Sequence, residues 1–365
     1  MISILAYVAI GFLALRSLVI LVNLFHAFFS TGAGEPGPLD LSILIPCRNE
    51  EKHIGLLLDC LLSLDNTPVE ILVCDDQSED KTYDIVAGFA ARHSRVRAIK
   101  GLPLPPGYTG KNWACVQLGK QARASFMLFL DADMAIKGTV LDALVTRMTR
   151  KRLDLLSVFP TQKMLSPGER ATVPVMNWIL LSLLPLPLVR ASRMKSFSAA
   201  NGQFMLYRST AYRELEPHRQ LRSNPVEDIA SMKLFKRNRL RCATFTGDKR
   251  IYCRMYHGRK EALQGFAKNV LHYFSCNVAW ILFFVLFTTL GLPIIALWSI
   301  PWFLASLVTA AAGRVMVSLA SRQHPLYNLV LSPLQHFNFL HMLVLAYRQK
   351  WRGTLTWKDR QIAVP

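Results

Sequence analysis

Hydrophobic and polar positions divide the chain into three parts. Residues 2–29 are apolar apart from Arg16, Asn23 and His26, and apolar character returns beyond residue 275. Between these ends, short apolar runs alternate with segments whose apolar residues have helical spacing. Such an alternation is typical of βαβ units and a parallel sheet. The pattern therefore predicts an α/β domain with membrane helices at both ends of the chain.

The middle part has a regular order of predicted elements. We expect strands at 41–46, 69–76, 96–101 and 126–133 and helices at 49–64, 78–93 and 112–123. The first helix carries acidic residues in its predicted first turn, and Ser78 is a candidate N-cap of the second. A Gly/Pro-rich linker at 30–38 precedes this part. The predicted domain therefore covers residues 39–272.

The N-terminal segment 1–29 predicts a transmembrane helix. It is longer than the apolar region of a signal peptide and has no basic residues at its start. Arg16 lies near its middle, where a charge costs about 3 kcal/mol on insertion scales. We therefore expect Arg16 to face another helix or a water-filled cavity. An amphipathic helix lying in the membrane interface is the alternative.

The C-terminal region 273–347 contains further membrane candidates. Residues 277–298 and 300–319 have the composition of spans, and 326–347 is a third candidate with four polar residues inside it, Gln335, His336, Asn338 and His341. Three crossings would place the basic tail 348–365 outside, whereas its charge predicts a cytoplasmic location. Either one segment is re-entrant or interfacial, or the tail breaks the charge rule.

A separate apolar segment, 173–190, is interrupted by three prolines. We expect it to lie in the membrane interface as part of the catalytic region. A buried core helix is the alternative interpretation.

Composition adds a strong positive charge to this picture. Among 365 residues, 43 Lys and Arg oppose 24 Asp and Glu, giving a net charge of +19. The basic stretches 233–241 and 254–260 lack the interleaved aromatics of a nucleic-acid surface, so we expect no nucleic-acid partner and assign them to anionic lipid. Seven scattered cysteines without a C-x-x-C pair indicate reduced thiols of a cytosolic domain.

The sequence "FMLFLDADMAIKG" (126–138) places Asp131 and Asp133 at the end of a predicted strand. Two such oxygen ligands suit Mg²⁺ or Mn²⁺, whose other ligands would be phosphate oxygens and water. A solvated acidic pair is the alternative. Asp76 ends an earlier strand, where it could accept a hydrogen bond from a nucleobase or cap a helix. Ligands of parallel sheets gather at these strand ends.

Two more acids, Glu227 and Asp228, start an amphipathic helix in "NPVEDIASMKLF" (224–235). Capping would need only one of them. A carboxylate that faces a metal and diphosphate could act as a general base toward an acceptor hydroxyl. The chain has neither the G-x-G-x-x-G fingerprint nor a Walker A loop, so a nucleotide would be bound in another way.

Seven segments in order resemble a known family: "LIPCRNEE", "CDDQSED", "YTGKNWACVQLGKQA", "LFLDADM", "SAANGQFMLYR", "VEDIASMKLFKR" and "RMYHGRKEALQGFAKN". Across about residues 40–270 the chain resembles the family 2 glycosyltransferases. The similarity is greatest to the bacterial membrane branch that includes carotenoid-acid, hopanoid-associated and ceramide-type enzymes. The resemblance implies a GT-A fold, an α/β architecture with a mostly parallel sheet flanked by helices, with N- and C-terminal transmembrane helices.

The resemblance also implies roles for individual residues. Pro46, Glu50 and Asp76 would line the nucleotide pocket, Asp131 and Asp133 would bind metal and diphosphate, and Asp228 would be the base of an inverting displacement. Lys111 and Trp113 would lie in a loop that covers the donor, with an ordinary anchored loop as the alternative. Asn201 and Gln203 would bond sugar hydroxyls, with a Gly-dependent turn as the alternative. Glu227, Arg254 and Lys268 would lie on the acceptor and diphosphate side, although both cations could instead face lipid headgroups.

One departure from the family pattern bears on the product. Processive members carry Q-x-x-R-W, whereas here Gln264 is followed by Lys268 and Asn269, without the Trp. We therefore expect transfer of one sugar, from a nucleotide-diphosphate sugar such as a UDP-hexose, to a membrane lipid.

A polyprenyl-phosphate glycosyltransferase and a non-enzymatic membrane scaffold are the alternatives. The expected location is the bacterial inner membrane, with the catalytic domain in the cytoplasm and no obligate protein partner evident.

Overall fold

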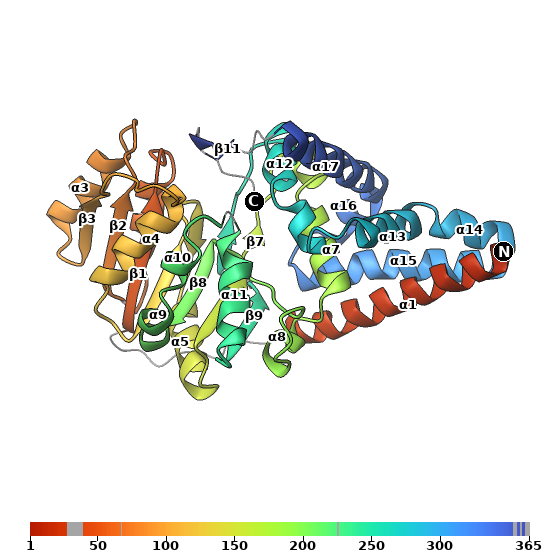
Figure 1. The fold of residues 1–365 in the computed structure, drawn as a ribbon, viewed down its shortest axis with the longest axis horizontal. Coiled ribbons are helices and arrows are strands. Elements are labelled where there is room, and N and C mark those ends of the chain that lie inside the picture. Colours follow the sequence, from red (N-terminus) through yellow and green to blue (C-terminus); the bar gives the residue numbers. More distant parts are fainter. Residues whose placement is uncertain (28–38, 67, 225, 353–355, 358–359, 362–365) are drawn as a thin grey trace.

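The fold is described here from a computed structural model. It describes the chain apart from residues 28–38, 67, 225, 353–355, 358–359 and 362–365. The predicted linker 30–38 and part of the basic tail lie outside the described residues. A domain built around a β-sheet occupies one side of the molecule, and a bundle of helices projects from the other (Figure 1).

The central sheet has seven strands in the order β3-β2-β1-β4-β8-β6-β9. The strands are β1 (Leu39–Cys47), β2 (Pro68–Asp75), β3 (Val96–Lys100), β4 (Phe126–Leu130), β6 (Leu155–Phe159), β8 (Phe204–Arg208) and β9 (Cys242–Thr246). Neighbouring strands are parallel, except that β8 runs antiparallel to both β4 and β6. The predicted mostly parallel α/β fold is therefore confirmed, with one inserted antiparallel strand.

Helices flank this sheet, and a small sheet lies at its edge. The helices are α2 (Ile54–Leu62), α3 (Thr82–Arg92), α4 (Gly110–Gln121), α5 (Val140–Arg150), α6 (Pro167–Arg170), α9 (Ser209–Leu215), α10 (Pro217–Gln220), α11 (Glu227–Arg237) and α12 (Arg259–Ala267). The small sheet consists of β5 (Met134–Ile136), β10 (Ile251–Cys253) and β7 (Thr161–Gln162).

Two predicted helix starts were wrong. Helix α2 begins at Ile54, so the acids at 50 and 51 precede it and do not lie in its first turn. Helix α3 begins at Thr82, whose backbone N–H donates to Asp80 Oδ1 at 2.9 Å, so Ser78 is not its N-cap. The backbone N–H of Ser78 instead donates to Asp75 Oδ2 at 3.2 Å, because the chain makes a turn before the helix.

Successive side chains of a strand point to opposite faces of the sheet, and each face has its own apolar core. Ile43 and Ile45 of β1 belong to one core, while Leu44 belongs to the other. The core that contains Leu44 also includes Trp178 and Phe284 of the bundle. Sheet domain and bundle therefore share one continuous apolar interior.

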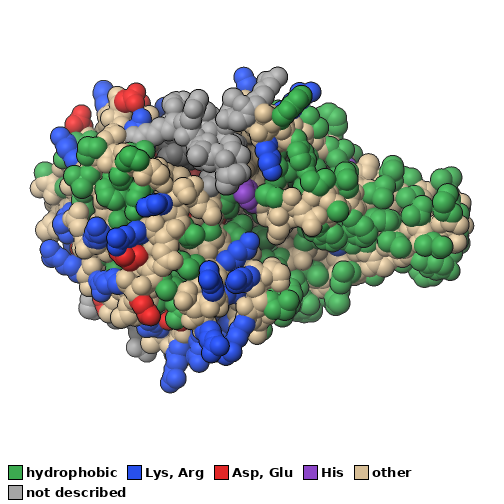
Figure 2. Space-filling view, viewed as in Figure 1, with side chains coloured by type: hydrophobic (Ala, Val, Ile, Leu, Met, Phe, Trp, Pro, Cys, Tyr) green, Lys and Arg blue, Asp and Glu red, His purple; other side chains and the backbone are tan. Residues whose placement is uncertain are grey.

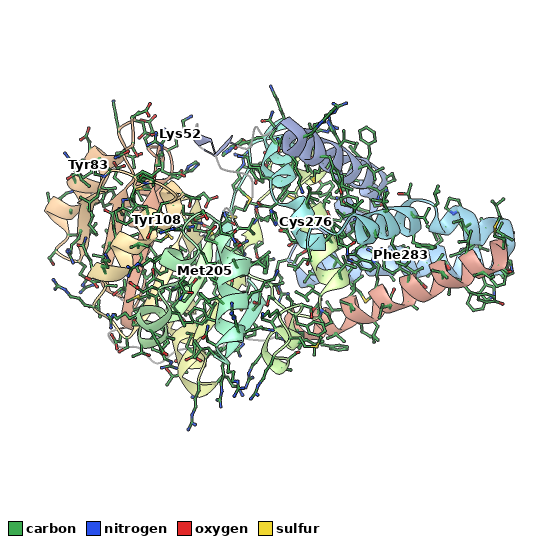
Figure 3. All side chains as sticks on the ribbon, viewed as in Figure 1. Lys52, Tyr83, Tyr108, Met205, Cys276 and Phe283 are labelled. Carbon is green, nitrogen blue, oxygen red and sulfur yellow. The ribbon has the colours of Figure 1, made fainter. Side chains whose placement is uncertain are left out.

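The bundle is built from both ends of the chain and one internal segment. Its elements are α1 (Ile2–Ala27), α7 (Pro174–Leu183), α8 (Pro187–Ala191), the 3-10 helix η1 (Val270–Phe274), α13 (Val278–Thr289), α14 (Gly291–Trp298), α15 (Ile300–Ala320), α16 (Pro325–Val330) and α17 (Ser332–Arg352). A short hairpin of β11 (Thr356–Trp357) and β12 (Arg360–Gln361) follows. The ring of Phe12 on α1 lies 5.1 Å from that of Phe283 on α13 (Figure 3).

Within the described residues, α1 and α15 are each long and apolar enough to cross a membrane. Helices α13 and α14 meet that requirement only as a pair, which is bent by 52°, so the number of candidate spans is two or three. Apolar side chains cover the projecting end of the bundle, while Lys and Arg gather over the sheet domain near the junction (Figure 2).

The third C-terminal candidate, 326–347, forms α16 and α17 and is not among the candidate spans. Its polar residues bond to the backbone at the start of α7. The side-chain amide of Asn338 donates to Ala171 O at 2.8 Å, and that of Gln335 donates to Arg170 O at 3.0 Å. Helix α17 therefore packs on α7 and α12 beside the sheet domain (Figure 1).

The segment 173–190 forms α7 and α8, and α7 is an interior helix. Val175, Ile179 and Leu181 are fully buried, and α7 contacts α1, α15 and α17. The expectation of an interfacial helix was therefore wrong for α7, because η1 contacts it as well and these four elements cover its apolar side chains. Arg16 faces another helix, as predicted, and donates to Ser182 Oγ at 3.0 Å.

Candidate active site

The carboxyl ends of three parallel strands bring the predicted donor residues to one edge of the sheet. The backbone N–H of Asp76, after β2, donates to Cys47 O at the end of β1 at 2.8 Å. Strand β4 runs parallel to β1 and ends at Leu130, so Asp131 and Asp133 lie in the turn that follows. No strand interior therefore has to accommodate the two carboxylates.

The antiparallel strand β8 begins where β4 ends, because Phe204 pairs with Leu130. The backbone N–H of Asp131 donates to Gln203 O at 3.1 Å. The side-chain amide of Gln203 donates to both oxygens of Asp133, at 2.8 and 3.1 Å. Gln203 therefore orients the second aspartate of the D-x-D pair, and its expected contact with sugar hydroxyls stays a prediction.

Asn201 serves the turn that precedes β8. Its Oδ1 accepts the backbone N–H of Gln203 at 2.9 Å, and its own backbone N–H donates to Ser157 Oγ at 2.8 Å. This geometry matches the turn interpretation of the segment.

Lys111 connects this edge of the sheet to a second pair of acids. Its Nζ lies 2.9 Å from Asp131 Oδ1, 3.2 Å from Glu227 Oε1 and 3.2 Å from Gly202 O. The residue lies in the first turn of α4, after the N-cap Thr109, so its predicted placement in a loop was wrong. An ammonium group is thereby placed among carboxylates from two distant segments.

Trp113 lies in the same first turn. Its Nε1 donates to Leu102 O at 3.1 Å, and its ring lies edge-on to Tyr108 at 5.2 Å. Figure 3 shows Tyr108 in the segment that precedes α4. Trp113 therefore anchors that segment, which agrees with the alternative interpretation of an anchoring aromatic.

Asp228 reaches the same site from the first turn of α11. The backbone N–H of Gly202 donates to its Oδ2 at 2.9 Å, and that of Ile229 donates to its Oδ1 at 2.7 Å. Gly202 thus binds Asp228 through its amide and Lys111 through its carbonyl. A Cβ atom on Gly202 would lie 3.0 Å from Glu227 Oε1, so a side chain there would crowd the site.

Sequence reasoning missed Asn112, which is fully buried beside Lys111. Its side-chain amide donates to Leu221 O at 2.9 Å and to Arg222 O at 3.2 Å. These bonds tie the start of α4 to the segment that leads into α11, which fixes Lys111 relative to Asp228. The asparagine that directly follows the predicted site lysine in "TGKNWA" was the signal that the sequence offered.

The electrostatics of the site are dominated by negative charge. Burial and the neighbouring Glu227 raise the pKa of Asp228 to about 7, against hydrogen bonds from backbone N–H groups. Burial and Asp131 raise the pKa of Asp133 to about 6, against the bonds from Gln203. Burial alone would lower the pKa of Lys111, but Asp131 and Glu227 hold it well above its usual value.

The predicted nucleotide-pocket residues lie beside this cluster. Pro46 and Glu50 lie at and just after the end of β1, and Glu50 Oε2 is 2.9 Å from His53 Nδ1. Asp76 is buried, and its carbonyl oxygen accepts from Arg48 Nη1 at 2.8 Å. A helix cap is therefore not the role of the Asp76 side chain, since Asp75 and Asp80 accept the N–H groups before α3.

The two predicted cations of the diphosphate side have different surroundings. Arg254 pairs with Glu169 at 2.9 Å. Burial would raise the pKa of Glu169, but hydrogen bonds from Arg254 and from Leu165 and Ser166 hold it at about 2. Lys268 follows α12, where burial lowers its pKa.

Comparison with known proteins identifies the sheet domain. The family model described as "Glycosyl transferase family 2" matches residues 42–216, which include the D-x-D pair, Lys111 and Gln203. The chain contains a family 2 glycosyltransferase domain. The matched region spans the donor edge described above, and Asp228 lies just beyond it.

Curated relatives of this glycosyltransferase are carotenoid-acid enzymes. It is 27% identical over 233 residues to the 4,4'-diaponeurosporenoate glycosyltransferase of Staphylococcus haemolyticus. The aligned region covers 63% of this chain and only 60% of that protein. It is 24% identical over 344 residues to the enzyme of the same name from Staphylococcus aureus strain USA300, covering 89% of this chain and 88% of that one.

Among solved structures, the mannosyltransferase PcManGT from Pyrobaculum calidifontis, in complex with GDP-Man and Mn²⁺, resembles this glycosyltransferase with a TM-score of 0.53. The likeness covers 98% of this chain and 100% of that one at 16% identity, so it concerns the fold.

The acids of this glycosyltransferase suit a divalent cation bound together with a diphosphate. The described residues contain no cluster of three or more His, Cys, Asp or Glu side chains arranged around one ion. Asp131 and Asp133 supply two carboxylates. The pKa of Asp133 is raised first by burial and then by repulsion from Asp131, and a bound cation would stabilise the charged carboxylate against both effects. Mg²⁺ and Mn²⁺ are commonly bound by one or two carboxylates plus phosphate oxygens and waters, so the donor set fits.

Proposed function

We propose that this family 2 glycosyltransferase moves one sugar from a nucleotide-diphosphate sugar, such as a UDP-hexose, to a membrane lipid, with inversion at the anomeric carbon. One observation carries the proposal. The peptide units of Gly202 link Lys111 and Asp131 on the donor side to Asp228 on the other. The carboxylates of Asp131 and Asp228 therefore lie close to one site. Transfer requires this, because the donor must lie next to the base that activates the acceptor.

On the donor side, Pro46, Glu50 and Asp76 would line the nucleotide pocket, and a nucleobase N–H would donate to the Asp76 carboxylate. Asp131 and Asp133 would hold a divalent Mg²⁺ or Mn²⁺ ion, which when bound neutralises charge on the leaving diphosphate. Lys111 lies 2.9 Å from Asp131 and would add a positive charge to the same region.

On the acceptor side, Asp228 would take the proton of an acceptor hydroxyl. The acceptor oxygen bonds to the anomeric carbon as the bond from that carbon to the diphosphate oxygen breaks. A base is effective when its pKa lies near the working pH, and the value of about 7 for Asp228 meets this condition. Glu227 contributes to that value and is itself paired with Lys111.

The bundle supports a membrane location with the sheet domain on the cytoplasmic side of a bacterial inner membrane. If α1, the bent pair α13–α14 and α15 each cross once, α17 and the basic tail remain on the side of the sheet domain. This arrangement satisfies the tendency of positive residues to stay cytoplasmic. It also removes the conflict that three C-terminal crossings would create.

A basic cavity beside α8 supports docking to anionic lipid. Its volume is about 280 Å³, and its lining carries five cations, Arg190, Arg193, Lys236, Arg239 and Arg241. Helix α8 contacts the domain end of α1, so the cavity lies near the proposed membrane surface. The names of the staphylococcal relatives support a carotenoid acid as acceptor, and a hopanoid or another lipid remains within the proposal.

The full chain in lipid nanodiscs, given a radiolabelled UDP-hexose, a divalent cation and extracted bacterial lipids, tests the proposal. We expect label in the lipid phase with the wild type and background levels with Asp133→Asn. Asp228→Asn should reach background with a hydroxyl acceptor and lose less activity with a carboxylate acceptor. Asp59→Asn, an exposed acid on α2, is the matched control and should retain activity. Label only in water-soluble products, or full activity of both site variants, would contradict the proposal. An acid-labile phospholipid product would identify a polyprenyl-phosphate acceptor instead.

A further inference from the structure

Two arginines inside the bundle share one tryptophan. Arg16 of α1 lies 4.6 Å from the ring centroid of Trp178 on α7, and Arg314 of α15 lies 4.0 Å from the same centroid. Arg16 also lies 5.0 Å from the ring of Phe284 on α13. Arg16 is only 7% exposed, whereas Arg314 keeps part of its surface open. Guanidinium groups from two helices distant in sequence therefore meet at one aromatic side chain.

The bundle supplies no carboxylate to balance them. The sequence has no Asp or Glu before residue 35, and none between Glu261 and Asp359. Helix α7, the other element at this cluster, also has none. None of the helices packed around these two positive charges therefore carries an acidic residue that could balance them. Charges in such surroundings are expected to be paired.

Polar contacts satisfy only part of the two guanidinium groups. Arg16 donates through Nε and Nη2 to one hydroxyl, Ser182 Oγ, at 3.3 and 3.0 Å. Arg314 donates through Nη1 to Gln335 Oε1 at 3.3 Å. A guanidinium has five N–H donors in a planar fork that matches an oxyanion. Aromatic faces attract a cation but carry no net charge, so they do not neutralise it.

We propose that Arg16, Trp178 and Arg314 form a binding site for the anionic headgroup of a lipid, through a phosphate or carboxylate oxyanion held by both arginines. The ligand would reach the site through the exposed part of Arg314. At a rise of 1.5 Å per residue, Arg16 lies about 16 Å from the end of α1 that is nearer the sheet domain, and Arg314 lies about 9 Å from the corresponding end of α15. The site is therefore in the half of the bundle nearer the catalytic domain. It is separate from the D-x-D edge.

The test uses the full chain in nanodiscs of phosphatidylcholine alone, with phosphatidylglycerol, and with oleate. We expect the wild type to unfold at a higher temperature when one anionic lipid is present. Arg16→Gln/Arg314→Gln should lose that response, needing about tenfold more anionic lipid or more for an equal shift, since charge-assisted bonds are removed. Arg92→Gln/Arg95→Gln, at two exposed positions at and just after the end of α3 in the sheet domain, is the matched control and should keep it.

The lipid that acts identifies the source of the oxyanion. A higher unfolding temperature with phosphatidylglycerol but not with oleate identifies the ligand as the phosphate of a phospholipid. A higher unfolding temperature with oleate identifies it as a carboxylate, the group that an acceptor acid would carry. In phosphatidylcholine alone, the double glutamine variant should be at least as stable as the wild type, because it removes two unbalanced charges. Lower stability of that variant in all three bilayers to the same extent would show a purely structural role and overturn the proposal.

A second measurement tests the proposal if the double glutamine variant does not fold. Native mass spectrometry of the purified wild type should show a retained anionic lipid, and Arg314→Gln, which leaves Arg16 in place, should retain at least about tenfold less. Equal retention by both proteins would overturn the site. None of these readouts depends on sugar transfer, so a failure here is distinguishable from a failure of the proposed function.

Discussion

The side-chain amide of Gln203 donates to both carboxylate oxygens of Asp133, at 2.8 and 3.1 Å. Gln203 directly precedes the antiparallel strand β8, and Asp133 follows the neighbouring strand β4. A partner that orients a metal-ligating carboxylate tunes the affinity of the site for the ion. The inserted strand would therefore affect the proposed metal site as well as the architecture of the sheet.

This contact predicts a metal defect for Gln203→Met. Without the amide, Asp133 loses its orienting partner, and the Mn²⁺ concentration for half-maximal activity should rise by about 10- to 100-fold. Titration of activity with Mn²⁺ after chelator treatment measures the effect. Gln121→Met is the control, because Gln121 accepts from Arg97 at the far end of α4. An unchanged metal requirement in Gln203→Met would contradict a positioning role for the amide.

The pH dependence of transfer should depend on the acceptor class. With a hydroxyl acceptor, Asp228 must be ionised to take the proton, so kcat/KM should fall as the pH drops below about 7. A carboxylic acid is already ionised near neutral pH, so its transfer requires no base, and the fall near pH 7 should be absent. Profiles of kcat/KM from about pH 5.5 to pH 9 for both kinds of lipid measure this difference.

Asp228→Asn extends the comparison. Removing the base should lower transfer to a hydroxyl by about 10²- to 10⁴-fold and should affect transfer to a carboxylate far less. Equal losses for both acceptors would contradict the assignment of Asp228 as a base.

The same substitution should stabilise the protein at alkaline pH. The pKa of Asp228 is raised from 3.8 to about 7 in the folded state, so folding binds a proton between these values, and this contribution to stability declines as the pH rises from about 4 to about 7. Asparagine stays neutral and can still accept from the Gly202 N–H. Asp228→Asn without donor or metal should therefore unfold at a higher temperature than the wild type at pH 8, with the difference shrinking toward pH 4.

Thermal unfolding followed at several pH values provides the measurement. Asp59→Asn, at an exposed position, should show no such trend. A wild type as stable as Asp228→Asn at pH 8 would mean that the buried carboxylate has little energetic cost.

Gly202→Ala should damage catalysis through space alone. Its Cβ would lie 3.0 Å from Glu227 Oε1 and 3.2 Å from Lys111 Nζ, so both side chains would have to shift. Because small misplacements of catalytic groups reduce rates strongly, we expect kcat/KM to fall by about 10- to 100-fold.

The control for this substitution is Gly88→Ala, on the exposed face of α3 with no atom within 4 Å of the added Cβ. It should gain about 0.5–1 kcal/mol of stability with activity unchanged. Steady-state kinetics and denaturant unfolding of both variants test the pair. Wild-type kinetics in Gly202→Ala would show that the site adapts to a methyl group.

The local sequence pattern was sufficient for the first four strands of the sheet and for the edge where the predicted donor residues lie, but it did not predict β6, β8 and β9. Strand periodicity depends on neighbouring residues only, so β1 to β4 were found close to their bounds, and the parallel arrangement brought Asp76 and Asp131 to one edge. Helix starts were less predictable. Both Ser78 and Asp80 have side chains suited to capping, and the turn between β2 and α3 decides which of them accepts the helix N–H.

The hydrogen-bond and ion-pair partners of polar side chains could not be predicted from the sequence pattern. Gln203 and Lys111 were recognised as site residues, but their actual contacts, Asp133 and the pair Asp131 and Glu227, depend on chain segments tens of residues apart. The polar residues of 326–347 similarly made a span doubtful. The contacts of Gln335 and Asn338 with the backbone of residues 170 and 171 explain two of them.

By itself, the amino-acid sequence determined the fold class, the order of the first four strands of the central sheet and the helices between them, the family motifs and the absence of acidic residues from the terminal helices. These properties follow from local periodicity and residue chemistry, which do not require knowledge of neighbours in space. Tertiary structure alone decided that α7 is an interior helix, that Gly202 links Lys111 to Asp228, and that Arg16 and Arg314 meet at Trp178. Each of these depends on which surfaces are buried against one another, and burial is a property of the packed molecule.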